Sequence, residues 1–356
     1  MRTARITLIG LLIMSGAALG QTPLPTIDGP ESPDLADAVR GYIVVDRPVG
    51  GIVAYELPEC RAHVVRPSGA GHAPVRSVSG PDRRGRIAFI ENSLLEKSHA
   101  LVTIKLDGSE TVEVLRRPGC ALWDEVIGEH LALAPVKGRC AFVSGLSRRQ
   151  MHDPKALLLI GSLEIWDVDR QEHVRTVSDV LDQGVSWFPD GDRLTFVKLM
   201  RRDELKEMWN SHDCAAGFGA WREVPVVCTH DVEKDVTTVL HVGRHPLITQ
   251  DGQSVLVQGW DLSYLRIAAD GEESEPVRWP GNWYGPLAVL DRGHVLYLGL
   301  PTTGTPPTFT EHNSPLVGPK PQGTIKLGEL NGRRFFTLLP EIDPRRKISY
   351  GCIPSN

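Results

Sequence analysis

The chain of 356 residues is long enough for one large repeat fold or for two ordinary domains, so its length alone does not set the number of domains. Its net charge of -5 comes from acidic and basic residues mixed along the whole sequence, which leaves no basic stripe for phosphates and excludes nucleic acid as an expected partner. Hydrophobic residues at 41% supply a sizeable core, and 35 Gly with 27 Pro indicate frequent turns.

Residues 1–20 have the layout of a secretory signal peptide. Arg2 and Arg5 precede an apolar run over 6–19 that ends in small residues and is shorter than a membrane span of about 20 apolar residues. We expect cleavage near Gly20 and a periplasmic or extracellular protein without a membrane span; an uncleaved anchor is the alternative. Residues 21–41, rich in Pro and polar residues, are expected to be a linker before a single monomeric domain at 42–356.

Two hairpin patterns alternate along the rest of the chain. The first has a tight turn with Asp, Gly or Pro; its clearest copy is 184–197, and fainter copies are 75–90, 131–143, 246–257, 287–298 and 341–350. The second has alternating apolar strands around a polar turn, at 51–65, 101–115, 163–177, 226–239, 264–277 and 324–338.

Each pair of hairpins predicts one four-stranded antiparallel blade, so the chain is predicted to be an all-β, six-bladed β-propeller. Because the first hairpin, 51–65, is of the second kind and the last, 341–350, is of the first kind, we expect both termini to contribute strands to one closing blade. Seven blades or an open stack of hairpins is the alternative.

The segment Trp187-Phe188-Pro189-Asp190-Gly191 and the strand after it carry a family resemblance. They resemble the WD-repeat-like motif of TolB-type propellers, in which Ser-Pro-Asp-Gly lies between the two inner strands, with Phe188 replacing the usual Ser. The other copies lack either the Pro or the Asp-Gly. The resemblance implies a periplasmic or extracellular protein that binds other proteins or small ligands at the mouth of a central channel.

In such a meander, the turns within hairpins lie on one face and the connections between hairpins and between blades lie on the other. We call these the turn face and the link face. The turns are short, whereas the links reach the length of 200–225 and 301–322, which favours the link face for binding. The predicted binding residues on its links are Trp123, Trp209, Trp221, Arg222, Trp260, Asp261, Trp283 and Tyr284.

Histidines on the same face leave an enzymatic alternative open. They are His99, His152, His212, His245 and His312. Some TolB-like propellers resemble polysaccharide lyases with metal-bound His, so the alternative is a metal-dependent lyase or related hydrolase using His212, His312 and His152. None of these residues has ligand spacing within its own link, and the sequence lacks a nucleophile elbow and a phosphate or dinucleotide loop.

We therefore predict no catalytic residue, no metal and no cofactor. The expected function is that of an exported, non-enzymatic binding or scaffold protein that recognises a protein, a small molecule or a glycan on its link face.

The 6 cysteines suggest disulfides, since the chain is expected to be exported. The predicted pairs are Cys60–Cys352 in the closing blade, Cys120–Cys140 at a blade junction, and Cys214–Cys228, which would hold the link at 200–225. The alternative is that these thiols are free and buried.

Overall fold

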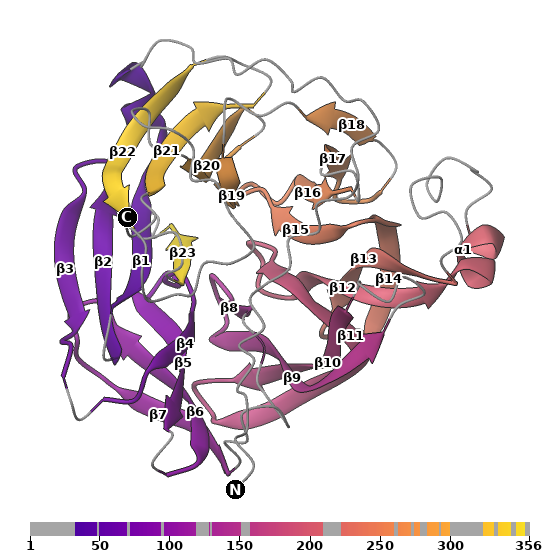
Figure 1. The fold of residues 1–356 in the computed structure, drawn as a ribbon, viewed down its shortest axis with the longest axis horizontal. Helices are drawn as coiled ribbons and strands as arrows, with labels where there is room; N and C mark the ends of the chain where they lie inside the picture. The colour runs from indigo at the N-terminus through magenta and orange to yellow at the C-terminus, as the bar shows by residue number, and fades with distance from the viewer. Residues whose placement is uncertain are drawn as a thin grey trace, which may run out of the picture.

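The computed structural model arranges antiparallel β-sheets around a common centre, which confirms the predicted all-β propeller arrangement (Figure 1). The structure describes residues 33–47, 50–69, 72–93, 96–118, 128, 130–150, 157–208, 222–259, 263–271, 274–277, 283–291, 293–299, 323–330, 334–342 and 347–352. Besides strands, these residues include a 3-10 helix, η1 (Pro33–Ala38), and a short helix, α1 (Arg202–Met208).

Four of the sheets have four strands each. One contains β23 (Ile348–Gly351), β1 (Gly41–Arg47), β2 (Gly51–Leu57) and β3 (Arg61–Arg66), in this order. The next contains β4 (Val75–Val78), β5 (Arg86–Ser93), β6 (Ser98–Lys105) and β7 (Val112–Pro118). The other two contain β15 (Arg244–Ile248), β16 (Ser254–Gln258), β17 (Tyr264–Ala268) and β18 (Ser274–Val277), and β19 (Trp283–Val289), β20 (His294–Gly299), β21 (Gly323–Glu329) and β22 (Phe335–Ile342).

The remaining sheet has seven strands. They are β8 (Leu131–Leu133), β9 (Arg139–Gln150), β10 (Leu157–Asp167), β11 (Glu172–Trp187), β12 (Arg193–Arg201), β13 (Glu223–Asp231) and β14 (Val236–Val242). The sheet is continuous because β11 has 16 residues: it pairs with β10 over its first part and with β12 over its last part. A bulge between Leu181 and Val185 separates the two parts.

The strands pack on both sides because apolar residues occupy both of their faces. On β5, Ile87 and Phe89 pack with residues of β1 and β2, whereas Ala88 and Ile90 pack with residues of β8 and β9. Side chains of a strand alternate between the two faces of its sheet, so a buried middle strand joins the cores on either side. The long runs of buried residues in β5, β6 and β12 are therefore expected of blades packed between neighbours.

The two ends of the described chain meet in one sheet. β23 pairs with β1, from Tyr42 opposite Gly351 to Val45 opposite Ile348, and β1 pairs with β2. The predicted hairpin at 341–350 is wrong, because residues up to Ile342 end β22 and only 348–351 form β23. The inner pair of this sheet is instead made by β23 and β1, whose residues are about 300 positions apart in the sequence.

Part of the predicted linker is packed on the propeller. Leu35 is 3% exposed and Val39 is fully buried, and both join the cluster that contains Leu338 and Leu339 of β22. Within the described part of the chain, no helix is long and apolar enough to cross a membrane.

The predicted Cys60–Cys352 disulfide is wrong, since both residues are free thiols. Cys60 follows β2 and Cys352 follows β23, so β1 lies between their strands, and two strand spacings of about 4.8 Å exceed the Cα separation of about 7 Å that a disulfide allows. The Cys60 thiol instead donates to the Leu338 carbonyl, at 3.1 Å. Cys140 and Cys228 are also free and are buried, and their predicted partners, Cys120 and Cys214, lie outside the described residues.

Candidate functional site

A cluster of polar residues lies on the link face where three consecutive inner strands begin. The strands are β8, the last part of β11, and β15, which lie next to one another around the centre of the ring (Figure 1). His130 directly precedes β8, Asp182 and Gln183 lie in the bulge of β11, and His245 lies in the bulge of β15. We call His130, Asp182, Gln183 and His245 the inner-strand cluster.

The Asp182 carboxylate orients the His130 ring. Asp182 Oδ1 lies 3.0 Å from His130 Nδ1 and accepts a longer hydrogen bond, 3.4 Å, from the His130 backbone N–H. The Asp182 side chain is 2% exposed and that of His130 is 36% exposed. The carboxylate accepts a hydrogen bond from Nδ1–H and so fixes the orientation of the ring. The pair therefore presents an oriented, half-buried imidazole ring on the link face.

The backbone at residue 128 lies so close to the Asp182 carboxylate that only glycine fits there. A Cβ on Gly128 would lie 2.4 Å from Asp182 Oδ1, well inside van der Waals contact. Gly184, next to the cluster, has a φ of +115°, which only glycine adopts without strain, and it packs on Pro246. Gly128 thus leaves room for the Asp182 side chain, and Gly184 allows the backbone conformation of the bulge that contains Asp182.

His245 is kept neutral beside this pair. Burial, with the nearby His130 and Arg244, lowers the pKa of His245 to about 3, and the Asp182 carboxylate and a hydrogen bond to the Gln183 backbone oppose this shift only in part. The His245 and His130 rings lie 6.1 Å apart between centroids. His245 also has a φ of 50°, an uncommon backbone conformation for a residue other than glycine. Such strain is often found at functional sites.

Gln183 adds a buried amide group to the cluster. Its side-chain oxygen, Oε1, is buried and has no hydrogen-bond partner among the described residues. A buried polar atom without a partner costs free energy, and native proteins carry few of them. This oxygen is therefore one of the few buried polar atoms of the described residues that are left without a hydrogen bond.

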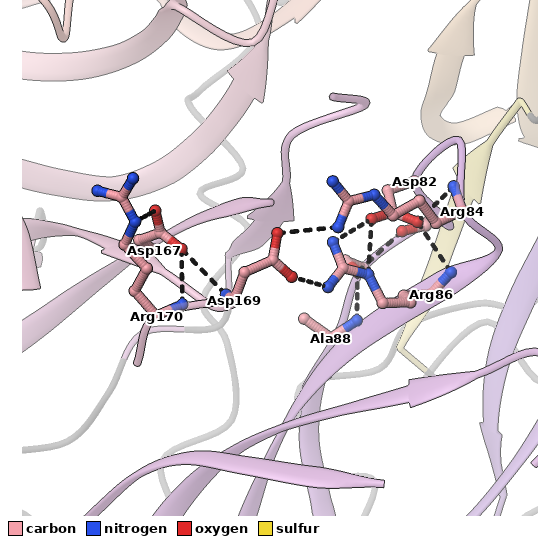
Figure 2. A network of polar contacts seen from close by, with 9 residues as sticks. Asp82, Arg84, Arg86, Ala88, Asp167, Asp169 and Arg170 are labelled. Carbon is pink, nitrogen blue, oxygen red and sulfur yellow. Dashed lines mark hydrogen bonds and ion pairs between the residues drawn. The ribbon is translucent and has the colours of Figure 1, made fainter. Parts of the chain in front are cut away.

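The turn face uses its charges differently, because they pair with one another across neighbouring blades. Asp82, in the turn between β4 and β5, accepts from the Arg86 guanidinium at 2.8 Å and from the backbone N–H groups of Arg84 and Arg86 at 2.9 Å (Figure 2). Arg86 also pairs with Asp169, which lies in the turn between β10 and β11 of the next sheet and takes a second bond from Arg84, at 2.9 Å (Figure 2). Arg86 therefore ties two turns together.

A related arrangement is found in the next blade, where both partners of the arginine lie in turns of the blade that follows. Arg139 on β9 pairs with Asp192, in the turn between β11 and β12, at 3.1 Å and also with Glu233, in the turn between β13 and β14. Lys137 adds another ion pair with Asp192. Both arginines start the second strand of their blade, at equivalent positions in the repeat. Their ion pairs therefore join neighbouring blades on the turn face.

The turn end of the inner strands is also joined by hydrogen bonds. Gln250, in the turn between β15 and β16, donates to the Tyr350 hydroxyl on β23 at 2.7 Å. That hydroxyl donates to the Arg40 carbonyl at 2.5 Å. These bonds link the sheet of β15 to the sheet that contains β23 and β1, and β19 is in contact with both β15 and β23.

Only some of the predicted site residues lie in the described chain. Trp283 and Tyr284 begin β19, the inner strand next to β15, so their backbone is at the same end of the ring as the inner-strand cluster. Arg222 is exposed beside α1, and its carbonyl accepts from the Arg202 N–H at 2.9 Å. The predicted residues outside the described ranges are Trp123, Trp209, Trp221, Trp260, Asp261, His152, His212 and His312.

Two of the five link-face histidines are described. His245 belongs to the inner-strand cluster, whereas His99 lies on β6, 4% exposed, and neither of its ring nitrogens has a hydrogen-bond partner among the described residues. No group of three or more His, Cys, Asp or Glu in the described ranges is arranged to hold a metal ion.

The sequence analysis missed His130, Asp182 and Gln183. A signal for them existed, since His130 stands directly before a segment read as an inner strand, at 131, and Asp182 and Gln183 are the two residues before another, at 184. Polar residues at the start of successive inner strands must converge in a propeller, because all inner strands start on the same face.

No protein-family model matches the sequence, and no curated protein matches it. Solved structures with a similar fold include TolB from Acinetobacter baumannii, at 13% identity and a TM-score of 0.43 over 91% of this chain and 76% of that chain. An oligogalacturonate lyase in complex with manganese is similar at 12% identity and a TM-score of 0.41, over 84% of this chain and 74% of that one. A prolyl endopeptidase is similar at 15% identity and a TM-score of 0.44, and the match spans 75% of this chain but only 36% of the endopeptidase.

Proposed function

We propose that this protein is an exported, non-enzymatic binding propeller that recognises its ligand or partner on the link face. The observation that carries the proposal is the opposite use of charge on the two faces. On the turn face, Arg86 pairs with one carboxylate of its own blade and one of the neighbouring blade, and Arg139 pairs with two carboxylates of a neighbouring blade. On the link face, the inner-strand cluster holds an oriented His130 ring and an acceptor, Gln183 Oε1, without a partner in the described chain.

The proposal includes a ring of six blades closed by both termini. Its support is the pairing of β23 with β1, together with the length of β11, which counts once as the outer strand of one blade and once as the inner strand of the next. Counted in this way, the seven-stranded sheet is two blades that share β11. A closed ring gives the link face a fixed geometry, which a recognition surface needs.

The face assignment is tested with matched charge reversals at exposed arginines. Arg222 is exposed on the link face, and Arg170, with a side chain that is 75% exposed, lies on the turn face. Tagged wild type, Arg222→Glu and Arg170→Glu proteins are compared for the partners they capture from envelope extract of the source cells. Loss of captured partners with Arg222→Glu but not with Arg170→Glu supports the proposal, and the reverse pattern contradicts it.

Export is tested separately. Cell fractionation with N-terminal sequencing is expected to find a mature chain that begins near Gln21 outside the cytoplasm.

The enzymatic alternative, a metal-dependent lyase, predicts a stoichiometric divalent metal in the purified protein that is lost in His212→Ala or His312→Ala. The binding proposal predicts no such metal, so elemental analysis of the folded protein separates the two.

A further inference from the structure

We propose that His230 is a proton-sensitive switch on the turn face: when its ring takes up a proton, the Asp235 carboxylate moves from Arg175 to His230. This change of partner releases the turn between β13 and β14 from β11. His230 lies on β13, Asp235 lies in the turn that follows, and Arg175 lies on the first part of β11. The inference concerns regulation of the fold and does not depend on the proposed function.

His230 is buried beside this turn with an unmet polar atom. The residue is 1% exposed. Its Nδ1 lies 3.0 Å from Thr237 Oγ1 of β14, whereas Nε2 is buried and has no hydrogen-bond partner among the described residues. Such an atom costs free energy whether it carries the proton or the lone pair, and an apolar side chain would avoid that cost. Packing alone therefore does not account for a histidine at this position.

The Asp235 carboxylate lies within reach of this nitrogen. Asp235 Oδ1 is 3.9 Å from His230 Nε2, which is longer than a hydrogen bond but close enough for a charge interaction with a protonated ring. The other carboxylate oxygen, Oδ2, lies 3.0 Å from Arg175 Nη1. A protonated imidazole and the guanidinium therefore compete for the same side chain.

The ion pair of Arg175 with Asp235 attaches the turn to β11. A second ion pair attaches the same turn to β9, where Arg139 pairs with Glu233. No printed contact of Glu233 involves His230, so a proton on His230 acts on the first attachment and leaves the second in place. Loss of the Asp235 contact would therefore loosen the turn without unfolding it.

The charges around His230 define what acid changes. Burial lowers the pKa of His230 below its ordinary value of 6.5, the Asp235 and Asp231 carboxylates oppose that shift, and Arg175 adds to it. Asp231 is held within the turn by Lys234, at 3.0 Å, so Asp235 is the carboxylate that can change its partner. A buried positive charge is costly unless it is paired. Protonation thus draws Asp235 toward His230 and repels Arg175.

The pH dependence of the ion pair between Arg175 and Asp235 tests the proposal. NMR of the histidine ring nitrogens on the full protein, with His230→Gln for assignment, gives the pH at which His230 takes up its proton. Double-mutant cycles with Arg175→Ala and Asp235→Asn are then measured by urea unfolding about one pH unit above and one below that midpoint.

We expect the coupling to disappear when His230 is protonated. The two side chains are 37% and 53% exposed, so the coupling should be a factor of about three in the unfolding equilibrium constant above the midpoint. Below the midpoint the factor should approach one. Asn at position 235 keeps a residue that tolerates the φ of 56° found there, so Asp235→Asn removes the charge without adding backbone strain.

The same cycles in two further backgrounds show whether His230 is responsible. In His230→Gln the coupling should stay at about threefold at both pH values. The matched control is His173→Gln, which changes an exposed histidine on β11 two positions from Arg175 and should leave the pH dependence of wild type unchanged. Circular dichroism establishes that each variant is folded, and His230→Asn replaces His230→Gln if the latter is not.

The proposal is overturned if the His230 ring stays neutral down to about pH 4.5, where aspartates begin to titrate. It is also overturned if the wild-type coupling is the same on both sides of the midpoint, a result that needs no histidine variant. A coupling that falls equally in wild type and in a folded His230 variant would assign the loss to another group and overturn it as well. These outcomes leave the proposed function untouched, since that is tested by the capture of partners.

Discussion

Arg86 and Asp169 form an ion pair between two neighbouring blades, and Arg86 holds Asp82 of its own blade with the same guanidinium. The side chains of Arg86 and Asp82 are 13% and 2% exposed, so this contact is largely shielded from solvent. The burial of Asp82 is tolerated because it accepts hydrogen bonds from a side chain and from two backbone N–H groups.

Replacing Arg86 with Ala is expected to lower the free energy of unfolding by about 3 kcal/mol, because it leaves the buried Asp82 carboxylate without its charged partner. Arg84→Ala is the matched control: its side chain is 62% exposed and it contacts the same Asp169, so we expect a change of at most about 0.5 kcal/mol. Urea unfolding measures both. Equal losses for the two variants would contradict a role for burial.

Gly80→Ala is expected to weaken the closing blade. A Cβ at this position would lie 2.0 Å from the Tyr350 carbonyl oxygen and 2.3 Å from its carbon, and these backbone atoms cannot move without displacing β23. We expect a loss of about 3 kcal/mol in the free energy of unfolding.

Gly69→Ala is the matched control for Gly80→Ala. Its nearest neighbour would be His72 Cδ2, at an ordinary contact distance of 3.7 Å. Thermal unfolding should therefore show a large drop in Tm for Gly80→Ala alone. A similar Tm for both variants would show that β23 is not held against the turn before β5.

Most hairpins of the fold could be predicted from local sequence patterns. The hairpin predicted at 184–197 is formed by the end of β11 and by β12, and that predicted at 101–115 is formed by β6 and β7. Such hairpins are predictable because their strands are adjacent in the sequence and their turns carry Asp and Gly. The two chain ends do share one sheet, as expected, but the hairpin predicted at 341–350 was wrong, since no local pattern shows that the partner of β23 is β1, about 300 positions away.

The site was predicted less well than the fold. The sequence pointed to the link face and to His245, but it missed Asp182 because that residue lies inside a long strand, β11, where carboxylates usually face solvent. Its burial follows from a bulge and from Gly128, which lies 54 positions earlier in the chain, and neither is visible in a local pattern. The disulfide prediction for Cys60 and Cys352 failed because membership of one blade does not set the distance between two thiols.

Glu164→Gln is expected to destabilise the protein near neutral pH. Burial of Glu164 tends to raise its pKa, but hydrogen bonds from Arg117, Ser144 and Trp166 outweigh burial and lower it below 4.5. The two Arg117 bonds measure 2.6 Å each. A carboxylate with a lowered pKa contributes stability above its ordinary pKa and loses that contribution as pH falls through the lowered value.

The expected loss for Glu164→Gln is about 3 kcal/mol at pH 7, shrinking as the pH falls below about 4. Glu113→Gln is the control, because Glu113 also pairs with an arginine, Arg116, but its side chain is 44% exposed and the pair is worth at most about 1 kcal/mol. Denaturant unfolding across this pH range measures both. A difference between wild type and Glu164→Gln that stays constant with pH would contradict the prediction.

His245 is expected to make the folded protein sensitive to mild acid. Burial and the nearby His130 and Arg244 lower its pKa from 6.5 to about 3, so between these values the unfolded chain binds a proton that the folded chain does not. Stability therefore falls as the pH is lowered through this window, by up to about 1.4 kcal/mol per pH unit from this group.

His245→Asn removes the titrating group while keeping a residue that tolerates a φ of 50°. Its free energy of unfolding should depend less steeply on pH between 6 and 4 than that of wild type, whereas His173→Asn, at an exposed position, should follow wild type. Parallel curves for His245→Asn and wild type would mean that His245 takes up its proton at the same pH in the folded and unfolded chains, which would contradict the lowered pKa.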